Sequence, residues 1–139
     1  MIKILVLCTG NSCRSQMAEG WLKNMTNNSH DIEIYSAGTS PEKVNPYAVD
    51  VMSRFGIDIS NNSSNHIDEY LNYNFDFVLT VCDNAKEKCP FFPSTNMIHH
   101  SFDDPANAKG SSSEVIEVYL RVCNEIRDYL KQFVSENIN

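Results

Sequence analysis

The stretch that decides the fold lies near the start of the chain and reads Cys8-Thr9-Gly10-Asn11-Ser12-Cys13-Arg14-Ser15. The residues before it, 2–7, are apolar and rich in β-branched side chains, which is typical of a buried strand. The residues after it place Met17, Trp21 and Met25, with Ala18 and Leu22, on one face of a helix. The octet is therefore predicted to be the loop that joins a strand to a helix N-terminus.

Such a loop is suited to binding an anion. Unpaired backbone N–H groups gather at a helix N-terminus, and the helix dipole favours negative charge there. Gly10 and Asn11 tolerate backbone conformations that other residues avoid, and the planar fork of Arg14 suits a tetrahedral oxyanion. The same surroundings favour the thiolate form of Cys8, which is the nucleophilic form. The predicted oxyanion cradle consists of Thr9, Gly10, Asn11, Ser12, Cys13, Arg14 and Ser15.

The alternative interpretation is a loop with two ordinary buried cysteines. A Cys-x5-Arg spacing alone would be a weak signal. Here a strand and an amphipathic helix flank it, and Gly, Asn and Ser lie inside it, so the anion loop is favoured.

The length, composition and net charge of the chain limit the classes of protein to which it can belong. With 139 residues, the chain is long enough for a single domain, 1–139, with one sizeable core. The net charge of −7 argues against nucleic acid and anionic membranes as partners. No apolar run reaches membrane-spanning length and no signal peptide is evident, so we expect a cytoplasmic protein. Five cysteines, an odd number, suggest reactive thiols rather than a disulfide scaffold.

The remaining elements follow from periodicity and capping signals. Strands are predicted at 33–38, 75–81 and 97–102. The first helix should end near 27–29. A second should begin after an Asn45 N-cap, bury one face that bears Ala48, Val49, Met52 and Phe55, and end at Gly56. A short helix is predicted at 65–71, with Ile67, Tyr70 and Leu71 pointing inward. A long helix should follow Ser111–Ser113, and its apolar stripe consists of Val115, Val118, Tyr119, Val122, Ile126, Tyr129, Leu130 and Phe133.

Alternating strands and helices imply right-handed crossovers and therefore an α/β fold. We predict a three-layer α/β/α architecture whose middle layer is a four-stranded parallel sheet. Ligands in such folds bind outside the carboxyl ends of the strands. Cys8, Cys82 and Asp104 should all lie at that edge, which makes them candidates for one site.

Several of these candidates also have a plainer interpretation. Cys82 and Cys89 could be small core residues or a redox pair, and from the residues alone the two are about equal. Asp104, which Pro105 holds in an extended conformation, could be a general acid or could simply cap a turn. Cys13 and Cys123 are interpreted as buried structural thiols. The four histidines, His30, His66, His99 and His100, form no recognised metal pattern with the cysteines.

The chain resembles the thioredoxin-coupled arsenate reductases, which share the fold of low-molecular-weight protein tyrosine phosphatases. The similarity runs through nearly the whole chain. The residues that carry it are 8–21, Tyr35-Ser36-Ala37-Gly38, Asn45-Pro46, 56–60, Thr80-Val81-Cys82, Cys89-Pro90 and Phe102-Asp103-Asp104-Pro105-Ala106. The phosphatases lack the Cys82 and Cys89 pair and usually carry a tyrosine soon after the proline, where this chain has Ala106-Asn107.

The resemblance implies a mechanism as well as a fold. Cys8 would attack arsenate held by Arg14 and the loop, and Asp104 would protonate the departing oxygen. Cys82 would then form a disulfide with Cys8 as arsenite leaves, and Cys89 would take over Cys82 for reduction by thioredoxin. No organic cofactor is needed, and we expect a monomer. Because a short helix at 82–89 could not contain a disulfide between its ends, this segment is predicted to rearrange on oxidation.

The resemblance also implies a potassium site, but the match is incomplete. The corresponding residues are Asn11, Glu19, Ser36 and Asn65, where Asn65 replaces the aspartate usual in potassium-binding members. A further departure is His99-His100-Ser101, where His-Trp-Gly is common. The runner-up functions are a tyrosine phosphatase, which Cys82 and Cys89 argue against, and a non-catalytic oxyanion-binding or redox-sensing module. The intact loop and Asp104 argue against the second.

Overall fold

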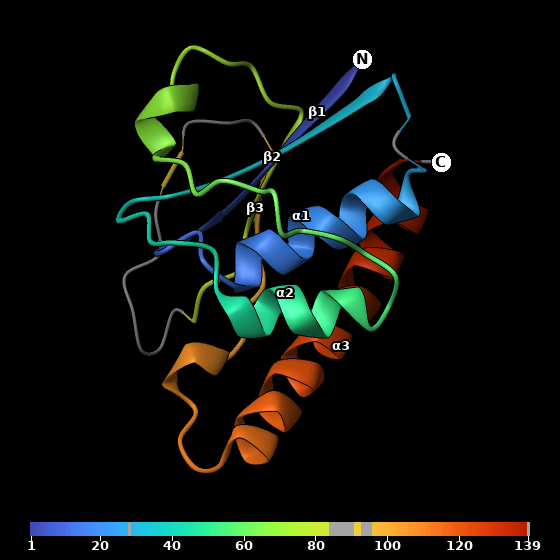
Figure 1. The fold of residues 1–139 in the computed structure, drawn as a ribbon. Helices are drawn as coiled ribbons and strands as arrows, with labels where there is room; N and C mark the ends of the chain where they lie inside the picture. Colours follow the sequence, from blue (N-terminus) through green and yellow to red (C-terminus); the bar gives the residue numbers. More distant parts are fainter. Residues whose placement is uncertain (28, 84–90, 93–95, 139) are drawn as a thin grey trace.

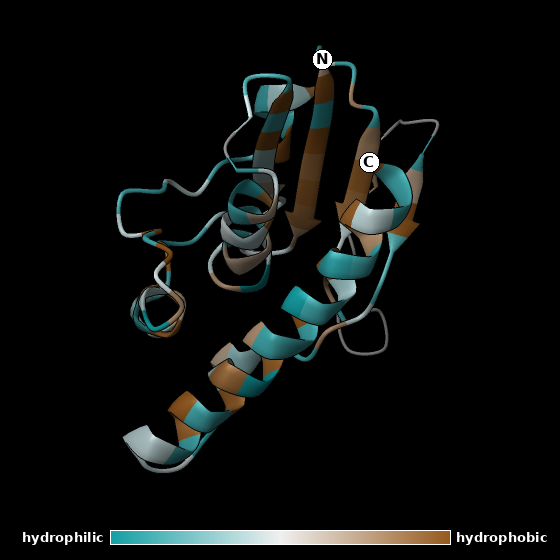
Figure 2. Ribbon diagram, turned by 90° about the vertical axis from the view of Figure 1, so that its right-hand side faces the viewer, coloured by the Kyte–Doolittle hydropathy of each residue, from teal (hydrophilic) through white to brown (hydrophobic). Residues whose placement is uncertain are grey.

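Four parallel strands form the centre of the protein in the computed structural model, which describes residues 1–27, 29–83, 91–92 and 96–138. The strands are β1 (Ile2–Cys8), β2 (Ile32–Gly38), β3 (Phe77–Thr80) and β4 (Met97–His99). They lie in the order β2-β1-β3-β4. The predicted parallel sheet is confirmed, and β1 lies in its interior, next to β2 and β3. Figure 2 shows the strands as mostly hydrophobic.

The last strand is shorter than the predicted 97–102. Its partner β3 ends at Thr80, and the backbone N–H of His100 makes a last bond to the Thr80 carbonyl at 3.0 Å. In the described residues, β4 ends at His99, one residue before this bond. The His100 ring then packs against Phe102 and Tyr129, with centroids 4.7 and 4.4 Å away.

The α-helices of the described residues share one side of the sheet. They are α1 (Arg14–Met25), α2 (Pro46–Ser53) and α3 (Ser112–Asn137), and they pack against one another over Ile4 and Val6 of β1 (Figure 1). The opposite side, which bears Leu5 and Leu7, is covered by the 3₁₀ helix η1 (Ile67–Tyr70) and an aromatic cluster. The second outer layer is thus formed, in the described part of the chain, by a 3₁₀ turn and rings.

The helix ends follow the capping signals in the sequence. The Asn45 side chain accepts a bond from the Tyr47 N–H at 2.8 Å, with Pro46 as the first residue of α2. Beyond its end, Gly56 has φ +77°, and the Ile57 N–H reaches the Met52 carbonyl at 3.1 Å, as in a Schellman motif. Ser111 caps α3 in a reciprocal pair with Glu114. Each of these boundaries could therefore be predicted from local chemistry.

Two predictions of inward side chains were wrong in part. Leu71 is 57% exposed, because η1 is a 3₁₀ helix. Its three-residue period puts Ile67 and Tyr70 on one side and turns Leu71 away. In α2 the buried face is Ala48, Val51 and Met52, whereas Val49 and Phe55 are half-buried.

In the described residues, no helix combines the length and apolarity needed to cross a membrane. A second 3₁₀ helix, η2 (Pro105–Asn107), follows Asp104. Residues 84–90, including Cys89, lie outside the described part of the chain. The rearrangement expected at 82–89 therefore stays a prediction.

Candidate active site

Cys8 lies where the loop predicted from residues 8–15 begins. It is the last residue of β1, and α1 begins at Arg14, so only residues 9–13 form the connection. The Cys8 Sγ lies 2.9 Å from the Ser15 Oγ and accepts a bond from the Asn11 N–H at 3.3 Å. The sulfur therefore faces donors at the start of the helix.

Asn11 holds the loop in its shape. It has φ +47°, in the left-handed region that asparagine tolerates better than most residues. Its side chain donates to the Ser15 Oγ at 2.8 Å and accepts from the Asn65 N–H at 2.8 Å. Its carbonyl accepts from the Ser64 Oγ at 2.8 Å and the Gln16 Nε2 at 3.0 Å. The sequence predictions did not include Gln16 or Ser64. Ser64 lies 53 residues from Asn11, and the Gln16 amide also bonds to the distant Ser63 carbonyl.

The end of β2 packs directly under the loop. A Cβ atom placed on Gly38 would lie 2.4 Å from the Thr9 carbonyl oxygen and 2.9 Å from that of Cys8. Only glycine can occupy this position without moving the loop backbone. The sequence indicated a strand end here but not this close approach.

Arg14 and Asp104 meet at the same edge. Arg14 is 3% exposed, and its Nη1 donates to the Phe102 carbonyl at 3.2 Å. Its Nη2 lies 3.5 Å from the Asp104 Oδ2. The Asp104 Oδ1 also accepts from the Ala106 N–H at 3.0 Å and so caps η2. The turn-capping interpretation of Asp104 is therefore correct, and the same carboxylate also faces the loop.

A cavity of about 240 Å³ opens at this edge. It is lined by Cys8, Thr9, Gly10, Ser12, Cys13, Arg14, Glu42, Asp104, Ala106 and Asn107. The structure thus brings Cys8, Arg14 and Asp104 around one space of a size suited to a small anion. Glu42 was missed, because no pattern in the segment between β2 and α2 distinguishes it.

The other cysteines occupy different environments. Cys13 is buried and donates to the Asp104 Oδ1 at 3.6 Å. Burial, followed by the charges of Asp104 and Cys8, raises the pKa of the Cys13 thiol well above its usual range. Cys123 is buried against Trp21 and Met52, as expected of a structural thiol.

Cys82 is buried just beyond β3, where the Val81 N–H bonds to the Leu7 carbonyl at 3.0 Å. Cys82 therefore lies at the same edge of the sheet as Cys8.

The histidines of the described residues have local roles. The His66 ring accepts a bond from the Asp68 N–H at 3.0 Å and caps η1. His99 bonds to Thr80 and Ser101, and His30 is exposed. In the part of the chain that the structure describes, no three His, Cys, Asp or Glu side chains are grouped to hold a metal.

Comparison with known proteins places this site in a family. The family model described as low molecular weight phosphotyrosine protein phosphatase matches residues 3–139. The chain belongs to this family. It is 47% identical over 133 residues to an arsenate reductase of Bacillus subtilis (strain 168), covering 95% of this chain and 94% of that protein. An arsenate reductase of Halalkalibacterium halodurans shows the same identity and coverage.

Solved structures share the fold over nearly the whole chain. An arsenate reductase in the phosphate binding state superposes with a TM-score of 0.80 at 27% identity, covering 98% of both chains. The YwlE arginine phosphatase has the same fold, with a TM-score of 0.76 at 21% identity, over 97% of this chain and 95% of that one. The same fold therefore occurs in a reductase and in a phosphatase.

The potassium site that the resemblance implied is a poor fit to the contacts in this member of the family. The Glu19 carboxylate accepts from the Lys23 Nζ at 2.7 Å through one oxygen and from the Ser36 hydroxyl through the other. The Asn11 side-chain oxygen is taken by the Asn65 N–H. Glu19 is the only charged residue among the four expected potassium ligands, and its carboxylate is already paired with Lys23 of the same helix.

Proposed function

We propose that the protein is an arsenate reductase that takes its electrons from thioredoxin through a relay of Cys8, Cys82 and Cys89. The observation that carries the proposal is the cavity in which Cys8, Arg14 and Asp104 converge. The relatives named arsenate reductase, at 47% identity over almost the full chain, support arsenate as the substrate.

In the first step arsenate occupies the cavity as an oxyanion. The backbone N–H groups of the loop and the Arg14 guanidinium hold its oxygens. The Cys8 thiolate attacks arsenic and forms an As–S bond, while one oxygen leaves as water after Asp104 supplies a proton. Asp104 is directed at the site because Arg14 and the Cys13 thiol contact its two carboxylate oxygens.

In the second step Cys82 attacks the Cys8 sulfur. A Cys8–Cys82 disulfide forms, the As–S bond breaks, and its electron pair stays on arsenic, which leaves as arsenite. Arsenic gains two electrons, and the two thiols lose two. Neighbouring strands lie about 5 Å apart, and a disulfide joins Cα atoms within about 7 Å. The register Leu7–Thr80 therefore supports the pairing of Cys8, the last residue of β1, with Cys82, which lies two residues after β3.

In the third step Cys89 attacks Cys82, which releases Cys8 and leaves a Cys82–Cys89 disulfide. A dithiol reductant of the thioredoxin class then restores both thiols, so no organic cofactor takes part. This cycle requires a reducing compartment, and we propose that the protein acts in the cytoplasm as a monomer.

A weak phosphatase activity is a second proposal for the same cavity. Phosphate and arsenate have nearly the same shape and charge, and the family includes phosphatases. Cys8, Arg14 and Asp104 would suffice for slow hydrolysis of an aryl phosphate. This activity would not need Cys82 or Cys89.

Trapping the relay tests the proposal directly. Reduced Cys89→Ser protein mixed with one equivalent of arsenate should release one arsenite and stop with Cys8 joined to Cys82. Non-reducing peptide mass spectrometry would detect that bond. A stable Cys8–Cys13 disulfide instead, or arsenite release without any disulfide, would contradict the proposed order.

A further inference from the structure

Glu42 contributes a second carboxylate to the anion cavity. The cavity lining contains one guanidinium, from Arg14, and two carboxylates, from Asp104 and Glu42. A carboxylate beside an anion site is unfavourable for a ligand that only carries negative charge. Its presence therefore calls for a reason in the chemistry of the ligand.

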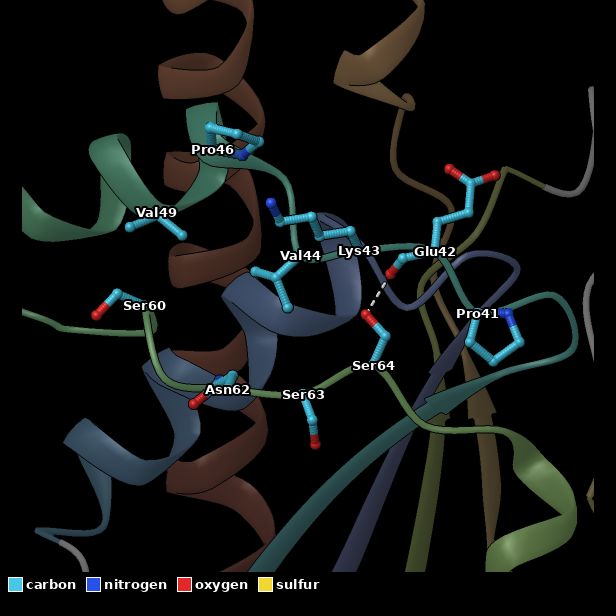
Figure 3. A pocket seen from close by; sticks show the side chains of 10 residues that line it. All are labelled: Pro41, Glu42, Lys43, Val44, Pro46, Val49, Ser60, Asn62, Ser63 and Ser64. Atoms are coloured by element: carbon cyan, nitrogen blue, oxygen red, sulfur yellow. Dashed lines mark hydrogen bonds between the residues drawn. The ribbon is translucent and has the colours of Figure 1, made fainter.

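The backbone of Glu42 is fixed against the loop. Its N–H donates to the Gly10 carbonyl at 2.8 Å, and its own carbonyl accepts from the Ser64 hydroxyl, as the dashed line in Figure 3 marks. Ser64 in turn bonds to the Asn11 carbonyl. The side chain therefore starts from an anchored position at the rim of the cavity.

Glu42 lines both the anion cavity and a neighbouring groove, and its side chain is directed away from the centre of that groove. In Figure 3 it points away from Val44, Val49 and Ser60, which line that groove. Its Cδ lies 3.8 Å from the position that a Cβ on Gly10 would occupy. The carboxylate is thus held close to the loop that would bind the oxyanion.

We propose that Glu42 determines which oxyanions the site accepts, by accepting a hydrogen bond from a protonated oxygen of the ligand. An ionised carboxylate can only accept hydrogen bonds. Arsenate and phosphate keep at least one O–H group near neutral pH, whereas sulfate has none. Glu42 would stabilise the protonated oxyanions and repel sulfate. This inference rests on the proposed oxyanion site and adds a selectivity to it.

Asp104 does not replace Glu42 in this role. It is the proposed proton donor to the departing oxygen, its Oδ1 accepts from the Ala106 N–H and the Cys13 thiol, and its Oδ2 pairs with Arg14. Glu42 is exposed, so its effect should lie at the low end of that of a charged hydrogen bond, about tenfold in affinity.

Anion binding without turnover tests the inference. Isothermal titration calorimetry would measure the Kd of sodium phosphate and of sodium sulfate for the reduced protein at constant ionic strength. The natural protein should prefer phosphate by about tenfold or more. Glu42→Gln should lose most of that preference, mainly by binding sulfate more tightly, because the amide can donate. Glu42→Ala should lose it as well, and Glu117→Gln, an exposed position of α3, should keep it.

Equal affinities for the two anions in the natural protein would overturn the inference. So would an unchanged preference in Glu42→Gln, or an equal gain for both anions, which would indicate general repulsion alone. Because no arsenate is reduced in this experiment, its outcome is independent of the reductase activity. Arsenate turnover with an unchanged anion preference would remove only the role of Glu42.

Discussion

The Nη2 of Arg14 lies 3.5 Å from the Oδ2 of Asp104, although one residue begins α1 and the other precedes η2. The Arg14 Nη1 is fixed on the Phe102 carbonyl, two residues before Asp104. Arg14 is therefore bonded to the same short segment after β4 that bears Asp104, the proposed acid. This arrangement ties the position of the acid to the position of the bound oxyanion.

Asp104→Asn should slow arsenate reduction by about 10²–10⁴-fold, the usual contribution of a positioned general acid. Asparagine can still cap η2, so the fold should be kept. Single-turnover arsenite release over a range of pH would measure the change. Asp103→Asn is the matched control, because Asp103 pairs with Arg121 on the surface. A loss of less than threefold at every pH for Asp104→Asn would reject its role as the acid.

The cysteine variants should separate two activities. Cys8→Ser should abolish both arsenate reduction and aryl phosphate hydrolysis, because both need the nucleophile. Cys82→Ser should lose arsenate turnover and keep the slow hydrolysis. Cys123→Ala, which alters a buried thiol against Trp21, should keep both and lose some stability. If Cys82→Ser folds and yet loses both activities together, the proposed division of roles is wrong.

Gly38→Ala should damage the site through the backbone. The new Cβ would meet the Thr9 and Cys8 carbonyls at 2.4 and 2.9 Å, so the loop must shift. We expect at least a tenfold loss of kcat/KM, since small displacements of a reacting group are costly. Gly20→Ala is the control. Its Cβ would crowd Met52 and Ile59 side chains, so it should lower Tm and spare activity. Equal kcat/KM in the two variants would contradict this role of Gly38.

Lys23→Met should create a response to potassium. In the natural protein Lys23 neutralises Glu19, so we expect Tm to be the same in potassium chloride and choline chloride. Without the lysine, potassium should bind to the Glu19 carboxylate and raise Tm by about 2–4 °C, which corresponds to a gain of about 1 kcal/mol in the free energy of unfolding. Lys131→Met, at an exposed position of α3, should show no such response. A potassium-dependent Tm in the natural protein would show that the ion binds despite Lys23.

The elements could be predicted where local chemistry decides them. Strand β1, the Asn45 cap and the Gly56 turn each follow from a few neighbouring residues, and the structure has all three. The outward position of Leu71 depends on a 3₁₀ geometry that apolar spacing alone does not reveal. The early end of β4 depends on the length of its neighbour β3.

The residues of the candidate site likewise include some that local sequence predicts and some that it does not. Cys8 and Arg14 lie within one motif, and the carboxyl ends of parallel strands bring Asp104 and Cys82 to their edge. Glu42, Ser64 and Gln16 could not be found, because each makes a backbone contact across the fold, which for Gln16 is its bond to the Ser63 carbonyl. Gly38 is a further example, since its closeness to Thr9 arises only when β2 lies beside β1.

Arsenite release from arsenate, coupled to thioredoxin, thioredoxin reductase and NADPH, tests the central claim most directly. The reduced protein should form one arsenite for each NADPH consumed, and omitting thioredoxin should stop turnover after one cycle. Arsenite formation that continues without thioredoxin, or no arsenite with the full system, would contradict the proposed function.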